Sequence, residues 1–319
     1  MAVYTQVTAE QLAVFLEAYD IGEPLSFKGI AEGVSNSNYL LDTTRARYIL
    51  TLYEHRTDEA DLPWFMALMT HLADAGLPVP RPIPDRAGQP LQRLNSRPAC
   101  LIEFLPGVSV SNPTAADCEQ AGLALARLHN AATSFTQPRP NSLGPGSWPP
   151  LAQHCQPRLH EIDPALPALI AKGLAITAHW PQNLPLGTIH ADLFPDNVLL
   201  QSHKVSGLID LYFACTDTLA YDYAITHAAW CFSADGQQHH APLAAALAQG
   251  YTSARPFNSA EQAALPLLGT GAALRFTLTR AYDWLNTPAD ALVTRKDPMA
   301  FARRLAWYAN ATPAQLLGQ

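Results

Sequence analysis

The sequence GTIHADLFPDNVLLQSHKVSGLIDLYFAC, which spans residues 187–215, contains the pattern His190-x-Asp192-x-x-x-x-Asn197. Asn197 begins an apolar run, a polar turn follows, and a second apolar run ends at Asp210. Two short apolar runs joined by a polar turn predict a β-hairpin. We expect this hairpin to return Asp210 to the side of Asn197, although 13 residues separate the two along the chain.

The same spacing occurs in the catalytic loop of protein kinases, His-Arg-Asp-x-x-x-x-Asn. Phosphoryl transfer needs one group that orients the attacking hydroxyl and accepts its proton, and oxygen ligands that hold Mg²⁺ on the phosphates. We therefore predict that Asp192 is the catalytic acid/base and that Asn197 and Asp210 are the Mg²⁺ ligands. His190 is predicted to support the loop by hydrogen bonding and to take no part in the chemistry.

A zinc hydrolase site is the main alternative for this segment, because His and Asp side chains bind zinc. Its candidate ligands are His190, Asp192, His203 and Asp210. However, His203 falls in the predicted turn, and the sequence contains no His-Glu-x-x-His or Cys-x-x-Cys pattern. A chance match is the other alternative, but three matching residues on a strand, loop and hairpin pattern favour a phosphotransferase.

The composition is that of a globular chain of about two domains. The 319 residues are 48% hydrophobic and 15% charged, which excludes a disordered chain. A net charge of −7 argues against a nucleic-acid-binding protein, which needs a basic face. No apolar run approaches the ~20 residues of a membrane span, so no membrane association is expected.

The first residues and the cysteines favour a cytoplasmic protein. The opening MAVYTQVTAEQL lacks the basic and apolar regions of a signal peptide. The five cysteines are scattered and include no Cys-x-x-Cys pair, as expected for reduced thiols in the cytoplasm. The sequence indicates no particular oligomeric state.

Residues 1–104 predict a small lobe built on an antiparallel sheet. Helices are expected where Thr8 and Asp58 begin amphipathic stretches. Strands are expected at residues 26–30, 38–41, 47–53 and 98–104. A break at Leu105-Pro106-Gly107 then predicts a hinge near residues 103–107, followed by a mainly helical lobe over residues 108–319.

Two segments of the small lobe are candidates for nucleotide binding. The turn after the first strand contains Gly33, Ser35 and Asn36, and kinase-like folds lay such a turn over the nucleotide phosphates. Backbone groups at the hinge could read the edge of adenine, and the residues concerned are Glu103, Phe104 and Leu105. Taken alone, an ordinary turn and an ordinary linker are the alternative interpretations.

The larger lobe places charged side chains on otherwise apolar helices. Its helices are expected at about residues 114–131, 219–232, 241–250, 260–286 and 301–310. Asp222 lies in an apolar helix, so we expect it to accept hydrogen bonds from the catalytic-loop backbone or from a basic side chain. Arg275 and Arg280 lie on the long penultimate helix, where one of them could bind a substrate carboxylate. Arg280 could instead pair with Asp283 at the i,i+3 spacing.

These motifs resemble the aminoglycoside-phosphotransferase and choline-kinase-like superfamily. The likeness is carried by HADLFPDNVL at residues 190–199, LIDLYFAC at 208–215 and YDYAI at 221–225. Other segments are similar to the bacterial homoserine kinase branch, which is unrelated to the GHMP kinases. They include GVSNSNY at residues 33–39, GLPVPRP at 76–82 and ALRF at 273–276. The resemblance covers essentially the whole chain.

The resemblance implies an α+β, two-lobed protein-kinase-like fold and a kinase that uses ATP and Mg²⁺. The acceptor that it implies is L-homoserine, whose side-chain hydroxyl would be converted to O-phospho-L-homoserine in threonine biosynthesis. Carried over residue by residue, Asp192 is the catalytic acid/base, and Asn197 and Asp210 hold the metal.

One departure from the superfamily pattern concerns the phosphate-binding cation. Thr51 stands where the superfamily usually has a lysine that contacts the α- and β-phosphates. Threonine is usual at this position in the homoserine kinase branch, so Thr51 is a candidate nucleotide-binding residue. Arg47, His55 and Arg56 are candidates for the cation that replaces the lysine.

A second departure concerns the acceptor. The stretch THAAW at residues 226–230 is less polar than the corresponding stretch of the homoserine kinase branch. If this stretch touches the substrate, Trp230 joins Arg275 and Arg280 as a candidate substrate-binding residue, and the specificity could differ.

Two competing functions share the same motifs. The acceptor could be an aminoglycoside, choline or another amino alcohol, but a polycation needs an acidic pocket and a quaternary ammonium needs an aromatic cage. Basic residues such as Lys296 suit a carboxylate better. The missing lysine also suggests a nucleotide-binding pseudokinase, although such a module would not need Asp192, Asn197 and Asp210 together.

Overall fold

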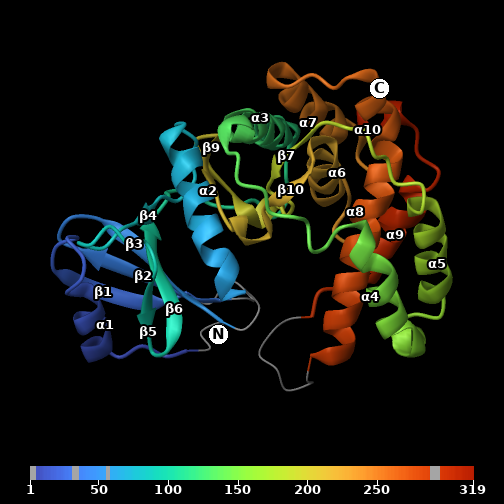
Figure 1. Cartoon of the computed structure of the whole chain (residues 1–319). Coiled ribbons are helices and arrows are strands. Elements are labelled where there is room, and N and C mark those ends of the chain that lie inside the picture. The colour runs from blue at the N-terminus through green and yellow to red at the C-terminus, as the bar shows by residue number, and fades with distance from the viewer. Residues whose placement is uncertain (1–4, 31–35, 55–57, 288–294) are drawn as a thin grey trace. The chain divides into compact units, whose positions relative to one another are not determined.

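The computed structural model describes residues 5–30, 36–54, 58–287 and 295–319. The chain divides into two compact units, Met1–Pro106 and Gly107–Gln319. The N-terminal unit is built on one sheet, whereas the C-terminal unit is mainly helical, as can be followed in Figure 1. This arrangement confirms the predicted α+β class.

The N-terminal unit contains a six-stranded antiparallel sheet in the order β1-β2-β3-β6-β4, with β5 paired to β6. Its strands are β1 (Pro24–Gly29), β2 (Asn36–Thr43), β3 (Arg47–Tyr53), β4 (Pro82–Ile83), β5 (Gln92–Leu94) and β6 (Arg97–Glu103). The meander predicted from the sequence corresponds to β1, β2 and β3. The register of β2 on β3 places Asn38 opposite Thr51.

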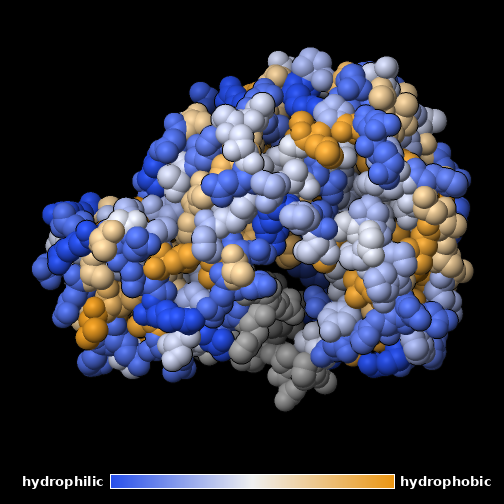
Figure 2. All heavy atoms as spheres, in the orientation of Figure 1, coloured by the Kyte–Doolittle hydropathy of each residue, from blue (hydrophilic) through white to orange (hydrophobic). Residues whose placement is uncertain are grey.

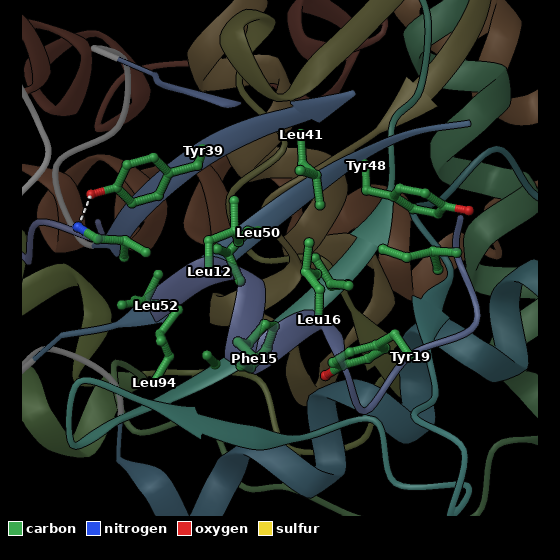
Figure 3. Close-up of a cluster of buried hydrophobic side chains, with 14 residues drawn as sticks. Leu12, Phe15, Leu16, Tyr19, Tyr39, Leu41, Tyr48, Leu50, Leu52 and Leu94 are labelled. Atoms are coloured by element: carbon green, nitrogen blue, oxygen red, sulfur yellow. Dashed lines mark hydrogen bonds between the residues drawn. The ribbon is translucent and has the colours of Figure 1, made fainter. Parts of the chain in front are cut away.

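A cluster of 14 buried side chains joins α1 (Ala9–Leu16) to one face of this sheet (Figure 3). The helix begins where predicted, because Thr8 and Gln11 form a capping box in which each side chain accepts from the backbone N–H of the other. The helix residues of the cluster are Leu12, Phe15 and Leu16. Burial of each such side chain contributes roughly 1.5–3 kcal/mol, which holds α1 on the sheet.

A second helix follows β3 after a short 3₁₀ turn. The turn is η1 (Glu59–Asp61), and Asp58 caps it by accepting from the Ala60 N–H. The helix α2 (Leu62–Asp74) buries an apolar stripe that includes Phe65 and Leu68.

The C-terminal unit contains most of the helices. They are α3 (Ala115–Ala131), α4 (Trp148–Cys155), α5 (Leu166–Thr177), α6 (Leu219–Trp230), α7 (Ala241–Ala254), α8 (Ser259–Asn286), α9 (Met299–Tyr308) and α10 (Pro313–Leu316). Short 3₁₀ helices lie at η2 (Ala132–Ser134), η3 (Pro145–Ser147), η4 (Gln156–Glu161), η5 (Pro195–Asn197) and η6 (Leu211–Phe213). Capping boxes begin α3 at Thr114 and α8 at Asn258, so local sequence sets both starts.

Two small antiparallel sheets hold the predicted motif. β7 (Leu186–Ile189) pairs with β10 (Cys215–Thr218), and β8 (Val198–Gln201) pairs with β9 (Lys204–Leu208). The loop between β7 and β8 therefore has a sheet at each of its ends, and this loop carries Asp192.

Helices α3 and α7 lie side by side because glycines let their backbones approach closely (Figure 1). A Cβ atom on Gly122 would collide with the Leu247 carbonyl, and one on Gly250 would collide with the Glu119 carbonyl. This packing fixes α3, which carries His129, a hydrogen-bond partner of Asp222 on α6.

The visible face in Figure 2 carries mainly hydrophilic residues, with hydrophobic residues in small separate groups. Among the described residues, no helix combines the length and the apolar character needed to cross a membrane. All five cysteines are buried and free.

Candidate active site

The β8–β9 hairpin brings Asn197 and Asp210 to the same end of the hairpin, as expected. Val198 pairs with Leu208, and the next backbone N–H, that of Ile209, donates to the Asn197 carbonyl at 3.0 Å. Asp210 follows in the left-handed conformation with φ of 60°, a region that Asp and Asn tolerate better than most residues.

Asp222 of α6 holds the start of the catalytic loop. Its fully buried carboxylate accepts from the backbone N–H groups of His190 at 2.7 Å and Ala191 at 2.8 Å. His129 also contacts this carboxylate, with Nε2 3.0 Å from Oδ2. Burial alone would raise the pKa of Asp222, but the hydrogen bond and charge of His129 hold it below its ordinary value. The carboxylate is therefore kept ionised where it binds the loop.

The backbone N–H and carbonyl of Ala191 are both hydrogen-bonded by side chains, which hold this residue in a strained conformation. Its φ is 62°, a left-handed value that costs an alanine roughly 1–2 kcal/mol. Asp222 accepts from its N–H, and Nη1 of Arg275 donates to its carbonyl at 2.6 Å. Strain of this kind persists where the surroundings over-determine it, and here it sets the direction of the next residue, Asp192.

His190 links the catalytic loop to the hairpin. It is fully buried, its Nε2 lies 3.0 Å from the Ile209 carbonyl, and the backbone N–H of Asp192 donates to its Nδ1 at 3.3 Å. These contacts require a neutral imidazole with its proton on Nε2, and burial lowers the pKa of His190. His190 therefore ties Asp192 to the residue that precedes Asp210.

Asp192 and Asn197 contact one another directly. The Asn197 amide nitrogen donates to the Asp192 carbonyl at 2.8 Å and to its Oδ2 at 3.2 Å. Among the described residues, Oδ1 of each side chain has no hydrogen-bond partner. Burial raises the pKa of Asp192 to about 7, while the Arg275 guanidinium opposes that rise. A carboxylate with a pKa near neutrality suits proton exchange with a hydroxyl group.

Asn197 and Asp210 suit a divalent cation whose remaining coordination positions are filled by other oxygen atoms. Mg²⁺ prefers one or two carboxylates together with phosphate oxygens and water. The amide nitrogen of Asn197 is engaged by Asp192, so its side-chain oxygen is the atom that can coordinate a cation. Within the described parts of the chain, no three His, Cys, Asp or Glu side chains converge on a possible metal site.

The zinc hydrolase alternative is wrong. His190 is buried and both of its ring nitrogens are engaged within the loop, whereas His203 is exposed in the turn between β8 and β9. The two histidines therefore do not meet at one site.

Residues 26–257 match the phosphotransferase enzyme family (APH). The match includes the N-terminal sheet and the whole of the Asp192, Asn197 and Asp210 arrangement. The chain belongs to the phosphotransferase enzyme family. The Asp192 loop lies within the matched residues.

Among the phosphotransferases, this chain is similar to homoserine kinases over its full length. It is 54% identical to the homoserine kinase of Gluconobacter oxydans over 315 residues, which cover 98% of this chain and 99% of the relative. It is 53% identical to that of Methylobacterium radiotolerans, covering 100% and 99%, and 52% identical to that of Caulobacter vibrioides, covering 96% and 97%. The predicted resemblance to the homoserine kinase branch is confirmed.

Solved phosphotransferase structures share the fold. The chain superposes on spectinomycin phosphotransferase with a TM-score of 0.72 at 15% identity, covering 98% of this chain and 100% of that chain. For an amicoumacin kinase the TM-score is 0.71 at 14% identity, with coverages of 96% and 95%. These values confirm the predicted kinase-like fold.

Thr51 of this phosphotransferase lies within the sheet. It is 2% exposed, and its hydroxyl donates to Oδ1 of Asn38 on the neighbouring strand at 2.8 Å. The hydroxyl hydrogen is thus already used, so this arrangement does not offer it to a phosphate.

The predicted phosphate-binding turn is described only at its end. Gly33 and Ser35 lie outside the described residues, as do His55 and Arg56. Asn36 is buried, and its Oδ1 accepts from the Glu54 N–H at 3.3 Å.

The other candidate cation, Arg47, has other partners. Its Nε donates to Asp42 at 2.6 Å, and its guanidinium lies over the Phe104 ring at 5.1 Å. Arg47 therefore does not fit the role of the missing lysine.

The hinge segment uses some of its backbone groups internally. The N–H of Glu103 donates to the Arg81 carbonyl at 2.9 Å, and that of Phe104 to the Arg47 carbonyl at 3.3 Å. By contrast, the Leu105 N–H makes no hydrogen bond with the described residues. Among Glu103, Phe104 and Leu105, Leu105 is thus the residue whose backbone N–H has no partner in the described parts of the chain.

Two predicted substrate residues support the loop instead. Trp230 is 1% exposed and its indole N–H donates to the Leu193 carbonyl at 2.8 Å. Arg275 is 2% exposed and holds Ala191. Direct substrate contact does not fit either placement, because each side chain donates to the backbone of the Asp192 loop itself and so holds that loop in place.

Three phenylalanine rings pack together near Asp192, and basic side chains lie over them. Only some of these basic residues were identified from the sequence. Phe276 packs against Phe194 with ring centroids 4.9 Å apart and against Phe301 at 5.0 Å. The cations on these rings are Arg275 over Phe276, Lys296 over Phe194, and both Arg280 and Arg304 over Phe301. Arg304 was missed, since the segment FARR looks like the ordinary start of an amphipathic helix.

Proposed function

We propose that the protein transfers the γ-phosphoryl group of ATP to the side-chain hydroxyl of L-homoserine, giving O-phospho-L-homoserine, a step of threonine biosynthesis. The observation that carries this proposal is the 54% identity to a curated homoserine kinase across 98% of this chain. The Asp192 loop supports it, because Asn197 donates to Asp192 and the β8–β9 hairpin returns the chain to Asn197 just before Asp210, a set of side chains that suits phosphoryl transfer.

In this reaction Asp192 orients the acceptor. Its free Oδ1 accepts the hydrogen of the homoserine hydroxyl, so that the oxygen is directed at the γ-phosphorus. As the new O–P bond forms and the bond to the ADP oxygen breaks, the hydroxyl proton passes to Asp192. The Asn197 amide, at 3.2 Å from Oδ2, keeps the carboxylate in this orientation. Positioned proton acceptance contributes about 10²–10⁴-fold to a rate.

We propose Mg²⁺ as the metal and Asn197 and Asp210 as its protein ligands. Held by these two side chains, Mg²⁺ would neutralise negative charge on the phosphates of ATP. The chain contributes two oxygen donors and leaves the remaining positions to phosphate and water. A structure of amicoumacin kinase contains AMP-PNP and Ca²⁺, which is in line with a divalent metal in this fold.

We propose that the N-terminal unit binds ATP through backbone groups. The free Leu105 N–H suits the adenine edge, with Glu103 and Phe104 flanking it. The turn that contains Gly33, Ser35 and Asn36 would lie over the phosphates, as in kinase-like folds. The spectinomycin phosphotransferase structure contains ADP.

The aromatic rings near Asp192 favour a carboxylate acceptor over choline. A quaternary ammonium needs open aromatic faces. Here Phe301 already faces Arg280 and Arg304 at 4.4 Å and 4.3 Å, and Phe276 faces Arg275 at 4.6 Å. These cations would repel a second cation, so an acceptor with a carboxylate is preferred. We place the reaction in the cytoplasm, where thiols remain reduced, since all five cysteines are free.

ATP consumption with Mg²⁺ across a panel of acceptors tests the proposal. The panel contains L-homoserine, L-serine, L-threonine, choline and kanamycin. Turnover with L-homoserine in clear preference to the others is expected. Turnover only with choline or kanamycin would support phosphoryl transfer but would show that L-homoserine is not the acceptor. ATP binding without any turnover would favour the pseudokinase alternative.

A further inference from the structure

Arg280 and Arg304 bring two positive charges to one aromatic ring. Arg280 comes from α8 and Arg304 from α9, two helices that pack together in the C-terminal unit (Figure 1). Their guanidinium carbons lie 4.4 Å and 4.3 Å from the centroid of Phe301. Like charges repel, so a second interaction is needed to make this arrangement favourable.

Neither guanidinium has a carboxylate partner among the described residues. Arg280 donates to the Asp297 carbonyl at 3.2 Å, and Arg304 donates to the Ser233 carbonyl at 3.0 Å. Arg304 is 5% exposed, and its Nε has no hydrogen-bond partner. By contrast, the buried Glu261 pairs with Arg255 at 2.7 Å, so the chain does neutralise buried charges elsewhere.

The lowered pKa values of the two arginines are in line with a site for an anionic ligand. Burial, together with the charge of the nearby Arg304, lowers the pKa of Arg280 to about 10. Burial likewise lowers the pKa of Arg304 to about 10. The acids that act on Arg280, including Asp192 and Asp297, do so from beyond ion-pair distance. A buried cation without a counter-charge is costly, and an anionic ligand would remove that cost.

The pair lies next to the catalytic loop within the same unit. Phe301 packs against Phe194 with ring centroids 5.9 Å apart, and Phe194 is the second residue after Asp192. The charge of Asp192 also reaches Arg280. A small acceptor could therefore place its hydroxyl at Asp192 and its carboxylate at the arginines.

We propose that Arg280 and Arg304 together bind the α-carboxylate of the acceptor and thereby select an amino acid over an amino alcohol. This assignment rests on the proposed homoserine kinase function and adds Arg304 to the acceptor site. Arginine suits the task because its planar donors match the two oxygens of a carboxylate.

The test compares L-homoserine with 3-aminopropan-1-ol, which is the same molecule without the carboxylate. Arg280→Gln and Arg304→Gln are each expected to lower kcat/KM for L-homoserine about 10- to 100-fold, mainly through KM. The value for 3-aminopropan-1-ol, or its inhibition constant where turnover is too slow, is expected to stay unchanged. Arg303→Gln is the matched control, because Arg303 is the adjacent residue and contacts Asp297 and the Asp235 carbonyl.

An equal loss with both acceptors would indicate a structural role and overturn the proposal. An unchanged KM for L-homoserine in both variants would do the same. If Arg304→Gln does not fold, the kinetics of Arg280→Gln alone test the proposal. Arg280 is only partly buried, so its replacement should leave the fold intact.

Failure of the function itself gives a different result, namely no turnover of L-homoserine by the wild-type protein. In that case 4-hydroxybutyrate, which has the carboxylate and hydroxyl without the amine, is titrated by calorimetry into wild type and Arg280→Gln. Binding to the wild type alone supports the carboxylate site, and equal or absent heats overturn it.

Discussion

The Oδ1 atom of Asp222 accepts a hydrogen bond of 2.8 Å from the backbone N–H of Ala191, which lies 31 residues earlier in the chain. Through this contact a residue of α6 controls the backbone directly before Asp192, the proposed catalytic residue. The carboxylate also binds the N–H of His190, so two adjacent donors depend on one buried side chain.

Asp222→Asn is expected to destabilise the protein and to slow the reaction. The amide keeps the shape of the side chain, but it replaces one acceptor oxygen with an NH₂ group that faces backbone N–H groups. Leaving such a buried donor unpaired costs about 1–3 kcal/mol in the free energy of unfolding. Urea unfolding measures this loss. Asp196→Asn, which changes an exposed acid of the same loop, should stay within about 0.5 kcal/mol of wild type.

Asp192→Asn is expected to lower kcat about 10²–10⁴-fold, because the variant cannot accept the hydroxyl proton. ATP binding should persist, since the change leaves the nucleotide-binding segments intact. Steady-state kinetics and nucleotide titration measure the two effects. Glu161→Gln, at an exposed ion pair with Arg158, is the control. A near-normal kcat in Asp192→Asn would refute the assigned role.

Asp210→Asn is expected to raise the Mg²⁺ concentration needed for half-maximal rate and to lower kcat. Asparagine tolerates the left-handed conformation at this position, so the fold should be retained. The change removes a charged oxygen donor from the metal site. A Mg²⁺ titration of the rate checks this, and an unaltered Mg²⁺ dependence would exclude Asp210 as a ligand.

Trp230→Phe separates loop support from substrate contact. The phenyl ring cannot donate to the Leu193 carbonyl, so the free energy of unfolding should fall by about 1 kcal/mol or more. We expect kcat to fall while KM for L-homoserine stays constant. A raised KM with normal kcat and stability would restore the substrate role that the sequence suggested.

The histidine pair His227 and His239 should make stability depend on pH. Their Nε2 atoms lie 3.4 Å apart; burial lowers the pKa of His239 from 6.5 to about 4, and it lowers that of His227 well below 6.5. Below pH 6.5 the unfolded chain therefore binds protons that the folded chain does not, so stability falls from pH 6.5 towards pH 4.

Urea unfolding at pH 7.5, 6 and 5 measures this effect. His239→Gln should flatten the fall in stability, because it removes one of the two titrating groups. His160→Gln, at an exposed position, should leave the profile as in wild type. A pH profile that is the same in all three proteins would contradict the prediction.

Local patterns were enough to predict the central hairpin and the main helix starts. The hairpin is a short-range feature, since a polar turn joins two apolar runs and brings Asn197 near Asp210. The helix starts at Thr8 and Thr114 follow from capping boxes within four residues. The hydrogen bonds to Asp222 could also be predicted, because a carboxylate in an apolar helix is costly to bury without donors.

The roles that could not be predicted depend on long-range packing. Trp230 meets the Leu193 carbonyl 37 residues away, and nothing local distinguishes it from a substrate residue. The role proposed for Arg304 depends on Arg280, which α8 brings to the same Phe301 ring. The partner of Thr51 depends on the register of two strands, which a shift of one residue would change.

The buried free cysteines have a practical consequence. Burial raises the pKa of Cys100, Cys118 and Cys215 to about 12, and alkylating reagents attack the thiolate form. The folded protein should therefore be inert to maleimides without removal of any natural cysteine. A single cysteine introduced on each unit would become the only point of attachment there, so fluorophores or spin labels could report distances between the two units during turnover.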